Sequence, residues 1–121
     1  MANKMEKWLT HEFSSGGYTG EDFNKFAREL KQEIKSQFGK AELELFLFTK
    51  GHYYISGFVF NPKTEKYAYF SISDVRYSRN EWWSNVLIRT AKNAKDYTGG
   101  FNQYCPLMAL GKATEHITGT N

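Results

Sequence analysis

The apolar residues change their spacing within residues 23–48, FNKFARELKQEIKSQFGKAELELFLF. As far as Phe38 they recur every three or four positions, which gathers them on one face of a helix. Gly39 follows at a position that suits the left-handed residue of a helix end, so we expect the helix to stop there. Beyond Gly39 the period is two, which predicts a strand that starts half-exposed and becomes buried on both faces. The helical positions are Phe23, Phe26, Ala27, Leu30, Ile34 and Phe38, and the strand covers residues 41–48.

Two more strands are expected directly after this one. Lys50 and Gly51 suit a hairpin turn, because glycine accepts a positive φ, and a second strand follows over residues 53–60. The polar cluster at residues 61–66 contains a proline, which fixes φ and cannot donate to a ladder. A third strand is expected over residues 67–75. Connections this short cannot form parallel crossovers, so the three strands make an antiparallel meander.

The last third of the chain offers weaker signals. Residues 86–91, VLIRTA, are a candidate for a fourth strand, and residues 76–85 are either its connection or a short helix. Pro106 fits the first turn of a final helix, although Gly111 weakens that helix. The apolar face of the helix would carry Leu107, Leu110, Thr114 and Ile117.

We expect a partly ordered N-terminal lead-in over residues 1–18 and a single α+β domain over residues 19–121. Thr19 and Asp22 resemble a helix cap. The expected architecture is a two-layer sandwich, in which an antiparallel three- to four-stranded meander packs against an N-terminal and a C-terminal helix. The sheet face away from the helices can then stay open. It would carry some of Tyr54, Phe58, Phe60, Tyr67 and Tyr69.

The composition disfavours several classes of protein. A chain of 121 residues needs no second domain, and its aromatic fraction of 17% favours an aromatic core. Cys105 is the single cysteine, so an internal disulfide is impossible and a secreted, disulfide-stabilised protein is not expected. The sequence has no signal-peptide pattern and no apolar run of about 18 residues, so we expect a cytoplasmic protein without a membrane partner. No metal or cofactor is expected, because no motif for one is present.

Positive charge is concentrated in one segment of a chain whose net charge is +3. Residues 76–95 hold five basic residues against the single acid Glu81, and a glycine pair follows at residues 99–100. Cations and outward-facing backbone N–H groups can together hold phosphates. The alternative is an ordinary strand and glycine turn with solvated lysines. The segment predicts a nucleic-acid-binding surface made of Arg76, Arg79, Arg89, Lys92, Lys95 and Tyr97.

Aromatic residues lead to two further hypotheses. Tyr and Phe side chains on an open sheet face can stack on unpaired bases, although the same residue types also serve in cores and strand pairs. Trp82 and Trp83 are adjacent, so on an extended segment one would be buried and the other available to a partner. Because tryptophan is enriched at interface hot spots, this pair is the predicted anchor for a protein partner.

An enzymatic function is not favoured. The spacings of zinc-protease, disulfide-exchange and serine-hydrolase motifs are absent from the sequence, so we assign no catalytic residue. The one conceivable catalytic arrangement brings His52, Asp74 and Arg89 together from neighbouring strands, as in a small nuclease. Cys105, which precedes Pro106, is expected to act as a small buried apolar group.

Four segments carry a resemblance to a known group of proteins: GHYYISG at residues 51–57, FSISDVR at 70–76, VLIRTAK at 86–92 and KDYTGG at 95–100. Around them the chain resembles small uncharacterised accessory proteins of phages and conjugative elements of Gram-positive bacteria. The resemblance supplies no catalytic residues. It implies a protein that binds DNA, regulates transfer or inhibits host defence.

Three functions follow. The leading one is a non-enzymatic binding protein of a mobile genetic element that contacts nucleic acid through residues 76–104. The second is a protein-binding inhibitor or regulator, such as an anti-CRISPR-like protein directed at a host protein, with Trp82 and Trp83 as anchors. The third is a small nuclease. An exposed edge strand or aromatic sheet face would also permit a homodimer.

Overall fold

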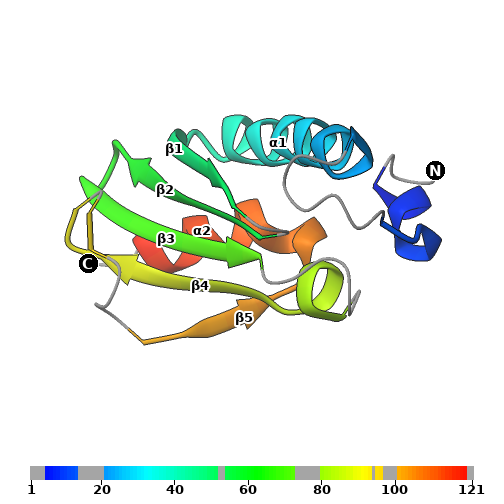
Figure 1. Ribbon diagram of the computed structural model, residues 1–121. Coiled ribbons are helices and arrows are strands. Elements are labelled where there is room, and N and C mark those ends of the chain that lie inside the picture. Colours follow the sequence, from blue (N-terminus) through cyan, green and yellow to red (C-terminus); the bar gives the residue numbers. More distant parts are fainter. Residues whose placement is uncertain are drawn as a thin grey trace.

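Five antiparallel strands form one sheet, and their order in the sheet is their order along the chain (Figure 1). The computed structural model describes residues 5–13, 21–51, 54–72, 80–93, 95–96 and 101–119. The three-stranded meander predicted from the short connections is therefore confirmed, the candidate fourth strand is present, and a fifth strand extends the sheet. The strands are β1 (Glu44–Lys50), β2 (Ile55–Asn61), β3 (Lys66–Ile72), β4 (Val86–Ala91) and β5 (Gln103–Cys105).

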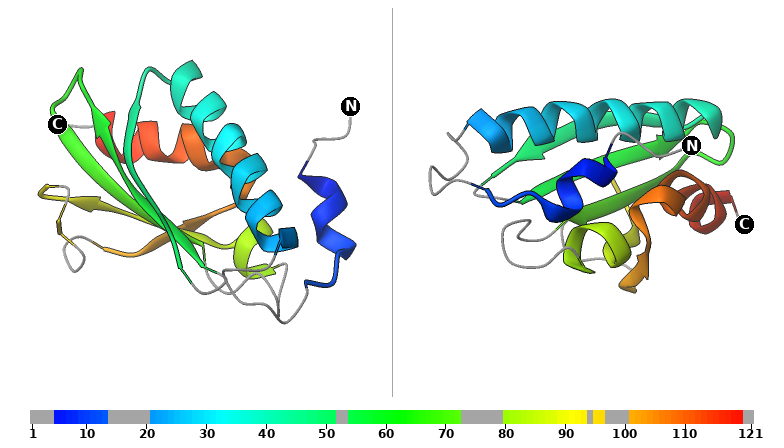
Figure 2. Two further views of the ribbon diagram at one scale, coloured as in Figure 1. Left: turned by 45° about the horizontal axis from the view of Figure 1, so that its top comes forward. Right: turned by 90° about the vertical axis from the view of Figure 1, so that its right-hand side faces the viewer.

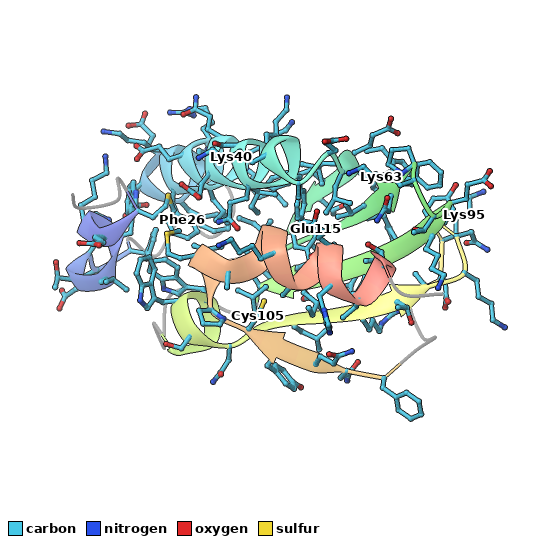
Figure 3. The ribbon with its side chains drawn as sticks, turned by 180° about the vertical axis from the view of Figure 1, so that it is seen from behind. Phe26, Lys40, Lys63, Lys95, Cys105 and Glu115 are labelled. Atoms are coloured by element: carbon cyan, nitrogen blue, oxygen red, sulfur yellow. The ribbon has the colours of Figure 1, made fainter. Side chains whose placement is uncertain are left out.

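Two α-helices pack on the same face of this sheet. The helix α1 (Glu21–Lys40) lies beside β1, and α2 (Leu110–Gly119) crosses β3 and β4. Figure 3, which views the molecule from behind, shows α2 in front of the sheet, and Figure 2 shows both helices from two further directions. Their apolar faces meet the inner side of the sheet in one core, where the ring centroids of Phe38 and Phe70 are 6.0 Å apart. The predicted α+β two-layer sandwich is confirmed.

The apolar stripe predicted for α1 is buried along its whole length, from Phe23 to Phe38. Ahead of α1, the described part of the lead-in forms the short 3-10 helix η1 (Glu6–Thr10). Trp8 of η1 is 5% exposed and meets the ring of Phe26 edge-on, with a centroid distance of 5.5 Å. Residues 5–13 therefore extend the core. The predicted cap at Thr19 lies outside the described residues.

The prediction that α1 ends at Gly39 is wrong. The helix continues through Lys40, and the left-handed residue is Glu42, with a φ of 58°. The backbone N–H of Leu43 donates to the carbonyl of Phe38 at 2.8 Å, and the N–H of Glu42 donates to that of Gly39 at 3.1 Å. These two bonds make a Schellman motif, and both Leu43 and Phe38 are buried in the core. The glycine therefore lies in the last turn and not at the left-handed position.

The prediction that the first strand becomes buried on both faces is also wrong. β1 is an edge strand, and it is exposed along most of its length. Its pairing register with β2 shifts between Leu45 and Leu47, which makes Phe46 the extra residue of a bulge. Phe46 is 48% exposed and Leu47 is 37% exposed. Apolar residues in a row mark a strand, but they do not determine whether another layer covers it.

Two elements in the second half of the chain differ from expectation. The connection before β4 contains a π-helical turn, η3 (Asn80–Ser84), so the two tryptophans do not lie on an extended segment. β5 was not predicted, because three residues carry no readable period. It pairs with β4 through Val86 opposite Cys105 and Leu87 opposite Tyr104. The chain then enters a 3-10 turn, η4 (Leu107–Ala109), and α2.

Gly111 explains how the two helices approach each other closely. A Cβ atom added at Gly111 would lie 2.8 Å from Cβ of Gln37 and 2.9 Å from its carbonyl oxygen. The Gln37 side chain accepts from the N–H of Gly111 at 2.7 Å and donates to the carbonyl of Leu107 at 2.9 Å. Gly111 lowers the helix propensity of α2, but because it has no Cβ it permits the contact with Gln37 that fixes α2 on α1.

Candidate nucleic-acid interface

Strand alternation and register place one set of side chains on the sheet face that neither helix covers. Across the sheet, Leu47 lies opposite Phe58, Phe58 opposite Tyr69, and Tyr69 opposite Arg89. Because neighbouring paired residues point to the same side, the whole row faces away from α1 and α2. In Figure 1 this side of the sheet is turned toward the viewer, with α2 behind it. We define the open face by Phe46, Leu47, Phe58, Phe60, Tyr67, Tyr69, Leu87, Arg89 and Tyr104.

Aromatic rings contact one another across the first three strands of the open face. The ring centroid of Tyr67 is 5.7 Å from that of Phe46 and 4.9 Å from that of Phe60. The rings of Phe58 and Tyr69 are 5.1 Å apart. Such spacings are those of favourable ring pairs. Phe58 is fully buried, whereas Phe46 is 48% exposed, so the cluster has a buried base and an accessible rim.

Arg89 lies within the open face but not at its surface. Its guanidinium carbon is 4.5 Å from the ring centroid of Tyr69, and the residue is 3% exposed. The Nη2 group donates to the carbonyl oxygen of Asp96 at 2.8 Å. The Arg89 side chain therefore shapes the connection that follows β4, and in this conformation it does not present its charge to a nucleic-acid strand.

The described residues at the start of the connection after β4 are linked by their own polar groups. The Asp96 carboxylate accepts from the backbone N–H of Lys92 at 3.0 Å, and the Asn93 side-chain oxygen accepts from that of Lys95 at 2.8 Å. Both lysine side chains are exposed. Figure 3 shows Lys95 at the same end of the sheet as Lys63, which belongs to the turn between β2 and β3. Lys63 is paired there with the Glu42 carboxylate at 3.2 Å, so it adds no net charge to that end of the sheet.

Of the six residues predicted to bind nucleic acid, the structure places two on the surface. Lys92 and Lys95 are exposed, whereas Arg89 is buried beneath the connection that it supports. Arg76, Arg79 and Tyr97 lie outside the described residues. Sequence reasoning missed Phe46 and Tyr104, the latter being 61% exposed on β5. No usable signal in the sequence marked Phe46, because the bulge breaks the two-residue alternation there, and none marked Tyr104.

The two tryptophans predicted as anchors occupy different environments. Trp82 is 1% exposed and meets Phe26 edge-on with a centroid distance of 5.1 Å, so it is a core residue and offers no surface to a partner. Trp83 is half-buried, with its ring 5.7 Å from that of Trp82. A role as a partner anchor is therefore limited to Trp83.

Outside the open face, the described part of the chain has few side chains that could take part in a reaction or bind a metal. Burial raises the pKa of the Cys105 thiol to about 11, which suits the inert apolar role expected for it. His52 and Asp74, two members of the conceivable nuclease arrangement, lie outside the described residues. Among the described residues, no three His, Cys, Asp or Glu side chains are grouped so that they could hold a metal ion. None of the described helices has the length and apolarity to cross a membrane.

Comparisons of the chain with protein-family models, with curated proteins and with solved structures found no match.

Proposed function

We propose that the chain is a non-enzymatic nucleic-acid-binding protein whose open face holds single-stranded DNA or RNA. The observation that carries the proposal is the accessible aromatic rim formed by Phe46, Tyr67 and Tyr104 on a sheet face without a helix. An unpaired base stacks on any such ring, because every base has a π-face. The ring of Tyr67 already contacts those of Phe46 and Phe60, so little side-chain entropy is lost when Phe46 and Tyr67 bind a base.

A single strand fits this face better than a duplex does. Bases in a duplex are stacked on each other inside the helix, and its grooves accept a helix or a ribbon in preference to a broad sheet. Single strands can splay their bases onto aromatic residues. Lys92 and Lys95 lie on the connection after β4, where they can neutralise phosphates of the same strand. A protein of this kind would serve the phage or conjugative element that the sequence resemblance indicates.

A fluorescence-anisotropy titration at low salt tests this function. We expect single-stranded oligonucleotides to bind more tightly than a duplex of the same sequence. Phe46→Ala and Tyr104→Ala should each weaken binding by about 1–3 kcal/mol, the range for loss of one stacking ring. Met108→Ala is the matched control, because Met108 is an exposed apolar residue on the helix side of the molecule. Absence of binding to every single strand would contradict the proposal.

A protein partner is the second candidate, and one observation favours it. Phe101 is 89% exposed just before the edge strand β5, and Tyr104 is 61% exposed within it. Exposed large aromatic side chains can serve as anchors for a protein partner. A host protein recovered in a pull-down with the wild type and lost with Phe101→Ala or Trp83→Ala, both variants remaining folded, would favour this regulator over the nucleic-acid function.

A further inference from the structure

A groove of about 350 Å³ lies between α1 and the edge strand β1. From the helix, Asn24, Ala27, Arg28 and Lys31 contribute to it, because spacings of three, four and seven residues bring side chains to one helical face. From the strand, Phe48 and Lys50 contribute, because residues two apart share one side of a strand. This groove is on the helix side of β1, and the open face is on the other side of the same strand.

The groove is strongly positive. Its described lining carries three cations, Arg28, Lys31 and Lys50, and no carboxylate. Lys31 Nζ lies 5.4 Å from the ring centroid of Phe48, and Lys50 Nζ lies 5.9 Å from that of Phe23 and donates to the Asn24 side-chain oxygen. The aromatic rings and the amide that contact these ammonium groups are uncharged. Positive charge in a hollow surface raises the local concentration of anions.

Two acidic residues of the same helix are paired with the η1 region, whereas Glu21 lines a neighbouring pocket with Asn24 and Arg28. Glu29 Oε1 lies 2.9 Å from Lys7 Nζ, and Asp22 Oδ2 lies 3.0 Å from a ring nitrogen of His11. Partial burial acts to raise the pKa of Glu29, but hydrogen bonds from Lys7 and Trp8 outweigh it and leave the pKa lowered. Glu29 and Asp22 are thus bound by the η1 region, on another side of α1 from the groove.

We infer that the groove binds the phosphodiester backbone of a single strand, an inference that rests on the proposed function and names where the strand continues beyond the open face. β1 is at the edge of the sheet. A single-stranded nucleic acid whose bases stack on Phe46 can therefore pass around β1 and enter the groove at Phe48. The bulge at Phe46 bends β1 at the place where the nucleic acid would pass around it, because a bulge bends the strand that carries it. The open face supplies stacking and the groove supplies most of the charge.

An abasic oligodeoxyribonucleotide tests the groove separately from base stacking, because it has phosphodiesters and no bases to stack. The test variant is Arg28→Gln/Lys31→Gln. Its matched control is Lys40→Gln/Lys112→Gln, which removes the same net charge from exposed helix positions that line a different pocket. All four side chains are exposed, so both double variants should unfold at the wild-type temperature.

Wild type and control should bind the abasic oligomer, and the groove variant should bind it at least about tenfold more weakly. The slope of log affinity against log salt should fall by about 1.4 in the groove variant, since each phosphate contact on a single strand accounts for about 0.7. Equal binding by all three proteins would overturn the inference, as would absence of abasic binding to the wild type.

A second arm with a base-bearing oligomer of equal length separates the two proposals. If the groove effect is present but the bases add no affinity, the groove stands and stacking on the open face fails. If the bases add affinity that Phe46→Ala removes while the groove variant matches its control, the open face stands and the groove fails.

Discussion

The guanidinium carbon of Arg89 lies 4.5 Å from the ring centroid of Tyr69, in the middle of the sheet face that neither helix covers. The same guanidinium donates to the Asp96 carbonyl, so one side chain joins the sheet to the connection after β4. Arginine suits this buried position because its planar guanidinium can stack on a ring and donate a hydrogen bond at the same time. The ammonium group of lysine lacks this planar geometry. Arg89 therefore supports the interface without being its contact.

Replacing Arg89 should lower the stability of the fold. Arg89→Ala loses the contact with Tyr69 and leaves the Asp96 carbonyl without this donor, for a combined cost of about 2–4 kcal/mol. Arg89→Lys keeps the charge but cannot reproduce the stacked, forked geometry, so its cost should be intermediate. Urea unfolding of the two variants measures both values. An alanine variant as stable as the wild type would show that the contact contributes nothing.

Two glycine substitutions in the helices should have opposite signs. Gly111→Ala should destabilise the protein by about 1–3 kcal/mol, because the added methyl group has no room beside Gln37. Gly39→Ala, in the last turn of α1 with no atom within 4 Å of the added Cβ, should stabilise it by about 0.5–1 kcal/mol. Thermal unfolding of both variants provides the comparison. If both variants were more stable than the wild type, helix propensity alone would determine the effect of the substitutions. The close approach of the two helices would then not limit the residue at position 111.

The left-handed residue after α1 gives a third prediction. Glu42→Gly should be more stable than Glu42→Ala by about 1 kcal/mol, because glycine has no Cβ to strain at a φ of 58°. The alanine variant is the proper control, since both changes remove the exposed ion pair with Lys63 at 3.2 Å. That pair contributes little in any case. Equal chemical denaturation midpoints for the two variants would contradict the Schellman geometry.

Cys105 should be unreactive in the folded protein. With a thiol pKa of about 11, only about 0.1% of the group is thiolate at pH 8, and the residue is buried as well. The rate of reaction with a disulfide reagent should therefore be slow, should rise with pH toward 11, and should increase sharply in denaturant. Rapid labelling of the native protein at neutral pH would show that β5 opens readily.

Local patterns predicted the elements whose sequence is long and periodic. The stripe from Phe23 to Phe38 and the alternation in β3 contain enough repeats to identify a helix and a strand. β5 spans three residues, Gln103–Cys105, and its pairing with β4 arises from tertiary contact alone. The end of α1 was misjudged because Gly39 suits a left-handed position without being required there, and the hydrogen bonds of Leu43 determine the outcome.

Exposure at the candidate site was the least predictable property. Lys92 and Lys95 were correctly expected on a surface, since lysine is seldom buried. The environment of Arg89 depends on Tyr69, a residue of another strand, and on the Asp96 carbonyl oxygen in the connection after β4. Phe46 was expected to be buried because its neighbours are apolar, and its exposure follows from the edge position of β1. Both results depend on which layers meet, and the sequence of one segment does not contain that information.

Amide chemical shifts measured while a short oligothymidylate is added to the isotope-labelled protein test the central claim most directly. We predict that shifts concentrate in β1, β3 and β5 around Phe46, Tyr67 and Tyr104, and that those of α2 change little. Shifts confined to α2 and η4, or no shifts at an oligonucleotide concentration well above that of the protein, would contradict the assignment of the open face as a single-strand-binding surface.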